Sequence, residues 1–396
     1  MSSSVSLIVR SRQFALFLSL WILVFVTGCG GENPDGGGET DSTAALTQDS
    51  IGVEGDGGEE VVEIDTGSVV DDVEGKYQFK LTPKVGEVYK YQLESRGNSK
   101  MAEISQSKNE TYDLTMSVVT VNDDGSLLLG VTYDRIRASI SVSAPQVDST
   151  GKPVVDSAGK PKIGKEKVTF DSKGGQNVKG GERYRAFIGK QVLVSITSDG
   201  TVTDVTNIEP ILNATLKALN VKSDTVNPKA LEYARLGIRT QIGLMVNQLF
   251  FTLAPDTAVS VGSTWARADS VPVNGLPASA TVSITLKAIR EADEGRRAEL
   301  ATTMKTNVAI PKKTIDDQYY TMKIDKVSLS GEGSWVVALT SGFPVTRSST
   351  IRSNFVGTAT MKAGPEKGKS QQVTASESTV MTVRRTAYTP APSAGE

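Results

Sequence analysis

The sequence of 396 residues contains no histidine and one cysteine, Cys29. The absence of histidine excludes Ser-His-Asp and Cys-His catalysis and His-ligated metal sites. A single cysteine excludes an intrachain disulfide and a thiolate cluster. The basic residues are scattered and not interleaved with aromatic ones, so nothing indicates nucleic-acid binding. No EF-hand spacing or phosphate-binding glycine loop occurs, and we therefore expect neither a metal nor a cofactor.

The first 28 residues have the order of a secretory signal. Arg10 and Arg12 precede an apolar run at 14–26, and small residues lead to Cys29. The run is 13 residues long, whereas a membrane-spanning helix needs roughly 20. A signal peptide over residues 1–28 is therefore favoured over a single-helix anchor.

Residues 26–29, Val-Thr-Gly-Cys, resemble the lipobox of bacterial lipoproteins. The resemblance implies that residues 1–28 are removed and that Cys29 carries acyl chains that anchor the protein to a membrane. Gly30, not Asp, follows the cysteine, which in the enteric sorting rule implies an outer membrane, at its periplasmic face or at the cell surface. The alternative is an ordinary signal peptide with an incidental cysteine.

The segment after Cys29 differs in charge from the rest of the chain. Residues 30–75 contain 14 Asp+Glu, 11 Gly and no Lys or Arg, which predicts that 29–75 are a disordered tether. Residues 76–396 hold 41 Lys+Arg and 31 Asp+Glu, a composition that favours attraction to polyanions or simply solubility. We expect one folded body at 76–390 and a disordered tail at 391–396.

Alternating hydropathy predicts that the body is mainly β. In 111–121, Tyr112, Leu114 and Met116 alternate with polar residues, and a turn at 122–125 leads into a second strand at 127–142. Further strands are predicted at 77–82, 87–95, 192–197, 201–205, 280–291, 297–309, 319–330, 334–340, 345–351, 355–361 and 373–385. About a dozen strands indicate a large curved antiparallel sheet, a sandwich or an open half-barrel.

Residues 208–253 are the exception and predict a helical insert. Asn227 is a typical helix cap and Pro228 a typical first helical residue. A helical apolar stripe follows, at Leu231, Ala234, Ile238, Ile242, Met245 and Leu249. We expect a helix of about 25 residues packed on one face of the sheet.

Several shorter patterns predict turns, loops or core residues and not active sites. Residues 145–181 are rich in lysine and are expected to form a long mobile loop, with an anion-binding flap as the alternative. Trp265 and Trp335 follow glycine turns and are expected to anchor the core. Asp123-Asp124 and Asp316-Asp317 are interpreted as turn residues.

Two patterns match catalytic motifs in the wrong context. Asp65-Thr66-Gly67 matches an aspartic-protease motif, but it lies in the acidic segment and has no second copy. Ser105-Gln106-Ser107-Lys108 matches the Ser-x-x-Lys motif of serine β-lactamases, but it lies in a predicted polar loop without the companion motifs.

The overall layout resembles an uncharacterised family of large bacterial lipoproteins over about residues 77–385. The resemblance depends on the segments KLTPKVGEVYKYQLES, GKQVLVSITSDGTVTDV, APDTAVSVGSTW and GEGSWVVALTSGFPVTRSSTI. These are structural turns and strands, so the resemblance implies an architecture and no reaction. A looser likeness, at the level of fold, is to the lipoprotein-carrier half-barrel, which binds acyl chains.

The favoured hypothesis is a non-enzymatic envelope lipoprotein. Its partners would be the membrane, through Cys29, and a hydrophobic, amphiphilic or polyanionic ligand or a protein. The predicted ligand cavity lies between the sheet and the helix, with Phe250 and Phe251 near its mouth. The candidate lining residues are Leu231, Ile238, Ile242, Met245, Leu249 and Phe250.

Two alternatives remain open. A carboxylate-dependent hydrolase would bring two acids from different strands into one cleft, one of them with a raised pKa. A purely structural surface scaffold would have neither a cavity nor convergent acids.

Overall fold

The structure is a computed structural model. It describes residues 68–69, 75–101, 104–146, 154–159, 161–174, 181–219, 221, 226–250, 254–255, 257–273, 276–305, 314–316, 320–362 and 367–392. The predicted signal peptide, Cys29 and the Asp65-Thr66-Gly67 motif lie outside these residues.

The described residues form one antiparallel sheet of 14 strands, which confirms the mainly β prediction. The strands are β1 (Ser68–Val69), β2 (Val88–Met101), β3 (Ile104–Val121), β4 (Leu127–Pro145), β5 (Ile163–Asp171), β6 (Gln191–Ile196), β7 (Val202–Thr206), β8 (Thr264–Val273), β9 (Leu276–Ala292), β10 (Gly295–Lys305), β11 (Thr314–Asp316), β12 (Tyr320–Ala338), β13 (Pro344–Met361) and β14 (Ser370–Thr389). Their order is β1-β9-β10-β12-β13-β14-β2-β3-β4-β6-β7, while β8, β11 and β5 pair with β9, β12 and β4.

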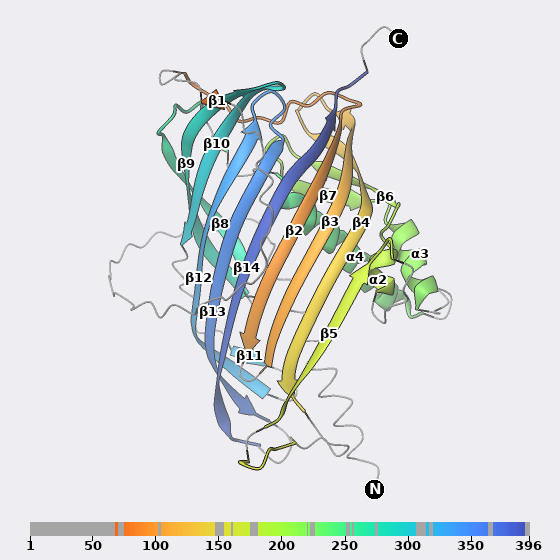
Figure 1. The fold of residues 1–396 in the computed structure, drawn as a ribbon, viewed down its shortest axis with the longest axis vertical. Helices are drawn as coiled ribbons and strands as arrows, with labels where there is room; N and C mark the ends of the chain where they lie inside the picture. The colour runs from red at the N-terminus through yellow and green to blue at the C-terminus, as the bar shows by residue number, and fades with distance from the viewer. Residues whose placement is uncertain are drawn as a thin grey trace.

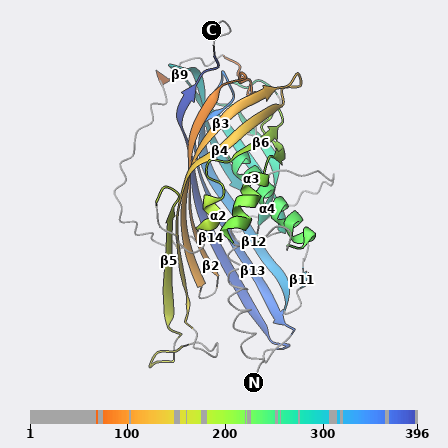
Figure 2. The same ribbon diagram turned by 90° about the vertical axis from the view of Figure 1, so that its right-hand side faces the viewer.

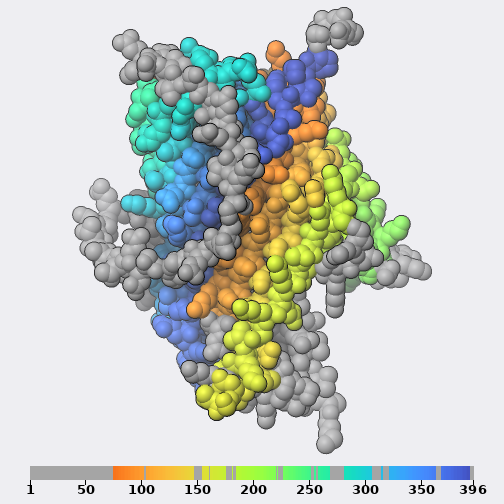
Figure 3. Space-filling view, in the orientation of Figure 1, coloured from red at the N-terminus to blue at the C-terminus, as the bar shows by residue number. Residues whose placement is uncertain are grey.

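The last strand joins the two halves of the sheet. β14 pairs with β2 along almost its whole length, from Ala375↔Met101 to Thr389↔Val88. In the space-filling view, β14 and β2 lie side by side across the outer face (Figure 3). The chain therefore closes its fold by pairing its C-terminal strand with its first long strand.

The two faces of the sheet differ in polarity because side chains alternate along each strand. On β2, Tyr89, Tyr91 and Leu93 are at most 2% exposed, whereas Lys90 and Arg96 lie on the opposite, exposed face. The sheet curves, and its helices lie on the buried, inner face (Figures 1 and 2).

Three helices are described: α2 (Glu182–Arg185), α3 (Glu209–Ala218) and α4 (Pro228–Asn247). The predicted start of α4 is confirmed, since the Asn227 side chain accepts a hydrogen bond from the Lys229 amide at 2.9 Å. Only the C-terminal part of its predicted stripe is buried: Ile242 and Leu249 have 0% exposure, while Ala234 is exposed. The helix lies on β7, where Asn247 accepts a hydrogen bond from the Val202 amide at 2.9 Å.

One predicted turn, at residues 331–334, is instead the interior of a strand. Gly331 and Gly333 lie inside β12, and neither has a positive φ. A side chain at Gly333 would place its Cβ 2.6 Å from the carbonyl oxygen of Ser348 on β13. The glycine is therefore explained by close strand packing, and Trp335 is a buried residue within β12, not the first residue of a new strand.

Three further predictions are corrected. Residues 77–82 form no strand, because only Tyr77 makes an isolated bridge, to Val259. The region 145–181 contains β5, whose residues pair with β4. The Ser105–Lys108 segment lies in β3 and not in a loop, because both neighbouring strands hydrogen-bond to it.

Two other features bear on attachment. Ser68–Val69, within the predicted tether, forms β1 and pairs with β9. Among the residues that the structure describes, no helix is long and apolar enough to cross a membrane.

Candidate functional site

The residues predicted to line a cavity lie at the contact between α4 and the sheet. Ile242, Met245, Leu249 and Phe250 belong to the main buried core. Ile238 is partly buried against that core, and Leu231, one turn from the helix start, is half-buried. Phe250 meets Phe343 edge to face, with ring centroids 5.1 Å apart. These side chains fasten α4 to the sheet, and Phe251 lies outside the described residues.

The inner face of the sheet continues beyond the helices. On β2 this continuation runs from Ser95 to Met101, a length of about 20 Å at roughly 3.3 Å per residue. We call it, with its partners on the neighbouring strands, the lower face, after its place in Figure 1. Among the described residues, α2, α3 and α4 lie above it (Figure 2).

An apolar cluster occupies the lower face on β12 and β13. Ile324, Val327, Leu329 and Phe355 are 4–6% exposed and form a cluster separate from the main core. The partly buried residues packed against them are Met304, Met322, Ile351 and Ala375. Every one of these residues lies on a strand, whereas the main core includes residues of α3 and α4.

Apolar side chains also lie on the β4–β5 side of the lower face. Register places Ile140 and Val142 of β4 on the same face as Lys108 and Gln106 of β3. Val168 of β5, opposite Ile140, is 43% exposed. The lower face is therefore apolar on both sides.

Polar groups lie in the middle of the lower face. Lys108 and Thr379 both pair with Gly97 of β2, from opposite sides. Ser99, the next inner-face residue of β2, pairs with Glu377. Lys108 and Thr379 therefore lie opposite each other across Gly97, which has no side chain, and Glu377 lies one inner-face position further along β14.

We call Lys108, Glu110, Glu377 and Thr379 the polar row, and Glu110 lies at its upper end. It is 4% exposed, and its carboxylate accepts hydrogen bonds from the hydroxyls of Tyr112 and Tyr184, each at 2.7 Å. Lys108 Nζ lies 2.6 Å from the same carboxylate. Burial acts to raise the pKa of Glu110, but the charge of Lys108 and the hydrogen bonds outweigh it and lower the pKa. Glu110 is thus an ionised group that holds α2, through Tyr184, against β3.

Glu377 has the opposite environment. Burial raises the pKa of its carboxyl above the ordinary 4.5, although a hydrogen bond from Thr379 and the charge of Lys108 lower it. The Thr379 hydroxyl lies 3.4 Å from the carboxylate, a weak contact. Glu377 is therefore the carboxyl of this row that is available to a ligand.

The two acids do not form a catalytic pair. Glu110 pairs with Ser95 and Glu377 with Ser99, on opposite sides of β2. Their backbone positions are thus about 16 Å apart, whereas paired catalytic carboxyls of glycosidases lie roughly 5–10 Å apart. Both oxygens of Glu110 are also occupied by hydrogen bonds. Glu110 and Glu377 therefore do not form the pair of convergent acids that a carboxylate-dependent hydrolase would need.

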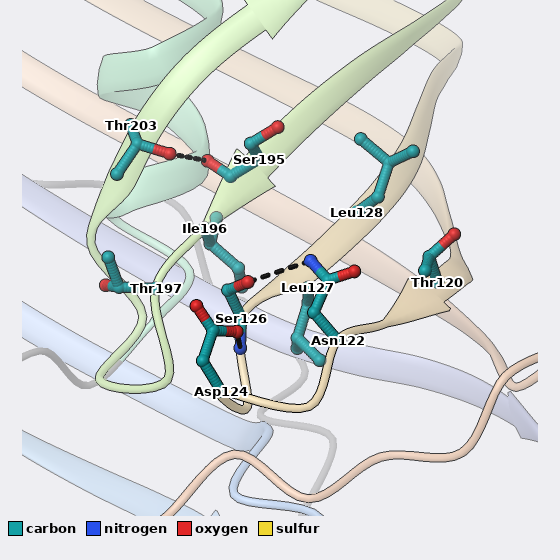
Figure 4. Close-up of a pocket in the computed structure, with 10 residues that line it drawn as sticks. All are labelled: Thr120, Asn122, Asp124, Ser126, Leu127, Leu128, Ser195, Ile196, Thr197 and Thr203. Carbon is teal, nitrogen blue, oxygen red and sulfur yellow. Dashed lines mark hydrogen bonds between the residues drawn. The ribbon is translucent and has the colours of Figure 1, made fainter.

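A hollow of about 510 Å³, lined by both polar and apolar residues, lies at the turns that join β3 to β4 and β6 to β7 (Figure 4). Its polar groups bond to one another: Asn122 donates to Ser126 Oγ at 2.8 Å, and the Ser126 amide donates to Asp124 at 2.9 Å. The lining residues are Thr120, Asn122, Asp124, Ser126, Leu127, Leu128, Ser195, Ile196, Thr197 and Thr203. Turn formation accounts for Asn122, Asp124 and Ser126, and it confirms the turn predicted at Asp124.

In the part of the chain that the structure describes, no group of three or more Asp, Glu or Cys side chains converges.

Solved structures that resemble the chain do so weakly. A lipovitellin structure concerned with lipid–protein interactions has 11% identity and a TM-score of 0.38, covering 80% of this chain and 26% of that chain. The low-pH structure of Pseudomonas putida OprB has 7% identity and a TM-score of 0.18, covering 75% of this chain and 92% of that one. The chain thus spans about a quarter of the lipovitellin chain. At these TM-scores the likenesses carry no argument. A search of curated proteins finds no match.

The sequence itself matches one family model. Residues 158–344 match DUF6263, a family of unknown function. The DUF6263 match is shorter than the resemblance expected over 77–385, and it runs from the segment before β5 to the start of β13. It includes α2–α4 and Leu329 but not Lys108, Glu110 or Glu377. The match agrees with the expectation of an uncharacterised family and supplies no reaction.

Sequence reasoning missed Lys108, Glu110 and Glu377. The signal was the period of the strands: stepping back by two from Tyr112 reaches Glu110 and Lys108, and stepping back from Met381 reaches Glu377. Polar residues at positions that the two-residue period assigns to the inner face were therefore the sequence signal for this part of the lower face.

Proposed function

We propose that this protein is a lipid-anchored, non-enzymatic protein of the bacterial cell envelope that binds an amphiphile along the lower face. The observation that carries the proposal is the second apolar cluster around Leu329 and Phe355, which lies on the inner face away from the helices. In an antiparallel sheet, apolar and polar residues usually alternate along the strands where one face packs on the core and the other faces water. Here the apolar side extends past the described helices.

The lower face is long enough for an acyl chain and offers it apolar side chains with polar groups beside them. Its length of about 20 Å compares with about 15 Å for the hydrocarbon of one bilayer leaflet. Apolar side chains on β12–β13 would contact the chain, and the Glu377 carboxyl and Thr379 hydroxyl beside them would hydrogen-bond a polar head group.

The Val-Thr-Gly-Cys motif supports the anchor. Acylation of Cys29 would hold the protein at a membrane, the place where an amphiphile is available. The proposed location is the outer membrane, at the periplasmic face or the cell surface, since Gly30 follows the cysteine.

A matched pair of variants tests the proposal. Ile351 is partly buried on the lower face, and Arg352, the next residue of β13, lies exposed on the outer face. With a fluorescent long-chain fatty acid and the purified full chain, Ile351→Gln should weaken binding at least tenfold, because it places an amide against the acyl chain. Arg352→Gln should bind within twofold of the parent. Absence of saturable binding by the parent, or equal affinity of the two variants, would sink the proposal.

A further inference from the structure

The helical hairpin of α3 and α4 exposes large apolar side chains at its tip. Leu219 and Val221 follow α3 and are 60% and 38% exposed, and Tyr233 and Leu236 in the first half of α4 are 73% and 59% exposed. Isolated exposed apolar residues are ordinary, but four on one short hairpin mark an interaction surface. We call these four exposed residues the hairpin tip.

Helix geometry fixes the direction in which the tip faces. Tyr233 and the buried Ile242 are nine residues apart, which at roughly 100° per residue places them on opposite sides of α4. An ion pair between Arg235 Nε and Glu209 Oε1, at 2.9 Å, holds α4 against the first turn of α3. The exposed side of α4 is therefore held toward solvent by packing on its other side.

Most of the charged residues around the hairpin tip are basic. Lys217, Lys229 and Arg239 are exposed on the two helices. The acids of α3 and α4 are Glu209, which is paired with Arg235, and Glu232. Exposed apolar side chains bordered by lysine and arginine are typical of surfaces that enter the head-group region of anionic membranes.

We infer that the hairpin tip docks into the surface of an anionic bilayer. Leu236 and Tyr233 enter the head-group region, where a tyrosine ring is favourable, and Lys229 and Arg239 contact lipid phosphates. The bilayer is favoured because exposed aromatic and aliphatic side chains are combined here with Lys217, Lys229 and Arg239, the side chains that contact anionic head groups. This contact is separate from amphiphile binding on the lower face. It would orient the folded body relative to the membrane to which the proposed acylation of Cys29 attaches the protein.

An environment-sensitive fluorophore tests the contact. Leu236→Cys in the full chain is labelled with a nitrobenzoxadiazole maleimide, and Val380→Cys, 39% exposed on the outer face of β14, is the control. The parent chain carried through the same labelling reports any reaction at Cys29. The labelled proteins are added to preformed vesicles of phosphatidylglycerol and phosphatidylcholine, or of phosphatidylcholine alone.

The expected result is at least a twofold rise in emission, with a blue shift, for the label at position 236 on phosphatidylglycerol vesicles. High salt, or Lys229→Glu with Arg239→Glu, should reverse it. An unchanged emission, or an equal change at position 380, overturns the inference. So does a shift without vesicles that grows with protein concentration, since the tip would then contact a second copy. Failure of fatty-acid binding or of Cys29 acylation would leave this result unaffected, so the two proposals fail separately.

Discussion

Replacing Lys108 by methionine tests the electrostatic account of the polar row. The substitution keeps the length of the side chain but leaves the Glu110 carboxylate, which is 4% exposed, without its cation. Breaking a buried pair by removing one partner costs about 3–5 kcal/mol. Proteins are stable by about 5–15 kcal/mol, so Lys108→Met should remove a large part of the stability. Urea unfolding followed by circular dichroism measures the loss.

The double variant Lys108→Met/Glu110→Gln should be more stable than Lys108→Met alone. A glutamine carries no charge. Tyr112 and Tyr184 now donate to different oxygens of Glu110, so the glutamine carbonyl oxygen would accept from one hydroxyl and its amide group would donate to the other. The remaining cost should be below about 2 kcal/mol, the range for neutral hydrogen bonds.

The loss of stability caused by Lys108→Met should also depend on pH. The pKa of Glu110 lies below its ordinary 4.5 in the folded protein, so its ionised form contributes stability above the unfolded pKa, and this stability is lost as pH falls through the folded pKa. Without Lys108 the folded pKa rises. The difference between Lys108→Met and the parent should therefore be largest at neutral pH and shrink below about pH 4.

Lys100 provides the control, because it lies exposed on the outer face of β2. Lys100→Met should change stability by no more than about 0.5 kcal/mol. If Lys108→Met costs the same as Lys100→Met, or if its cost does not fall with pH, the buried ion pair does not stabilise the protein as described.

Three further substitutions test the core and helix α4, and one tests the polar row. Phe343→Ala should cost about 3–5 kcal/mol in urea unfolding, because its ring has 0% exposure, and the exposed Val380→Ala should cost under about 0.5; equal costs would contradict the core assignment. Gly237→Ala should stabilise by about 0.5–1 kcal/mol, since nothing lies within 4 Å of the added Cβ; a fall in Tm would contradict it. Asn227→Ala should cost about 1 kcal/mol by loss of the helix cap, and no change in Tm would argue against the cap. Since a raised folded pKa lowers stability as pH rises, Glu377→Gln should raise Tm at pH 7 more than at pH 4; equal Tm changes at both would refute the raised pKa.

Much of the fold was predictable because local chemistry and tertiary structure agree. The alternation in 111–121 and the turn at 122–125 gave the β3–β4 hairpin, and Asn227-Pro228 gave the start of α4. Both signals lie within a few residues of the structure they specify.

The errors arose where distant contacts decide the structure. Gly333 resembles a turn residue locally, but its lack of a side chain is required by Ser348 on the neighbouring strand. The basic region that contains β5 has no apolar alternation, and it becomes a strand by pairing with β4. Lys108 and Glu377 come onto neighbouring positions of one face only through the pairing of the last strand with the first long one.

Photocrosslinking tests the central claim most directly. A diazirine-bearing long-chain fatty acid is bound to the full chain, irradiated, and located by peptide mass spectrometry. The account predicts adducts in residues 322–329 of β12 and 351–355 of β13, reduced by Ile351→Gln and unchanged by Arg352→Gln. Adducts confined to α4, or scattered labelling that excess unlabelled fatty acid does not compete away, would contradict amphiphile binding on the lower face.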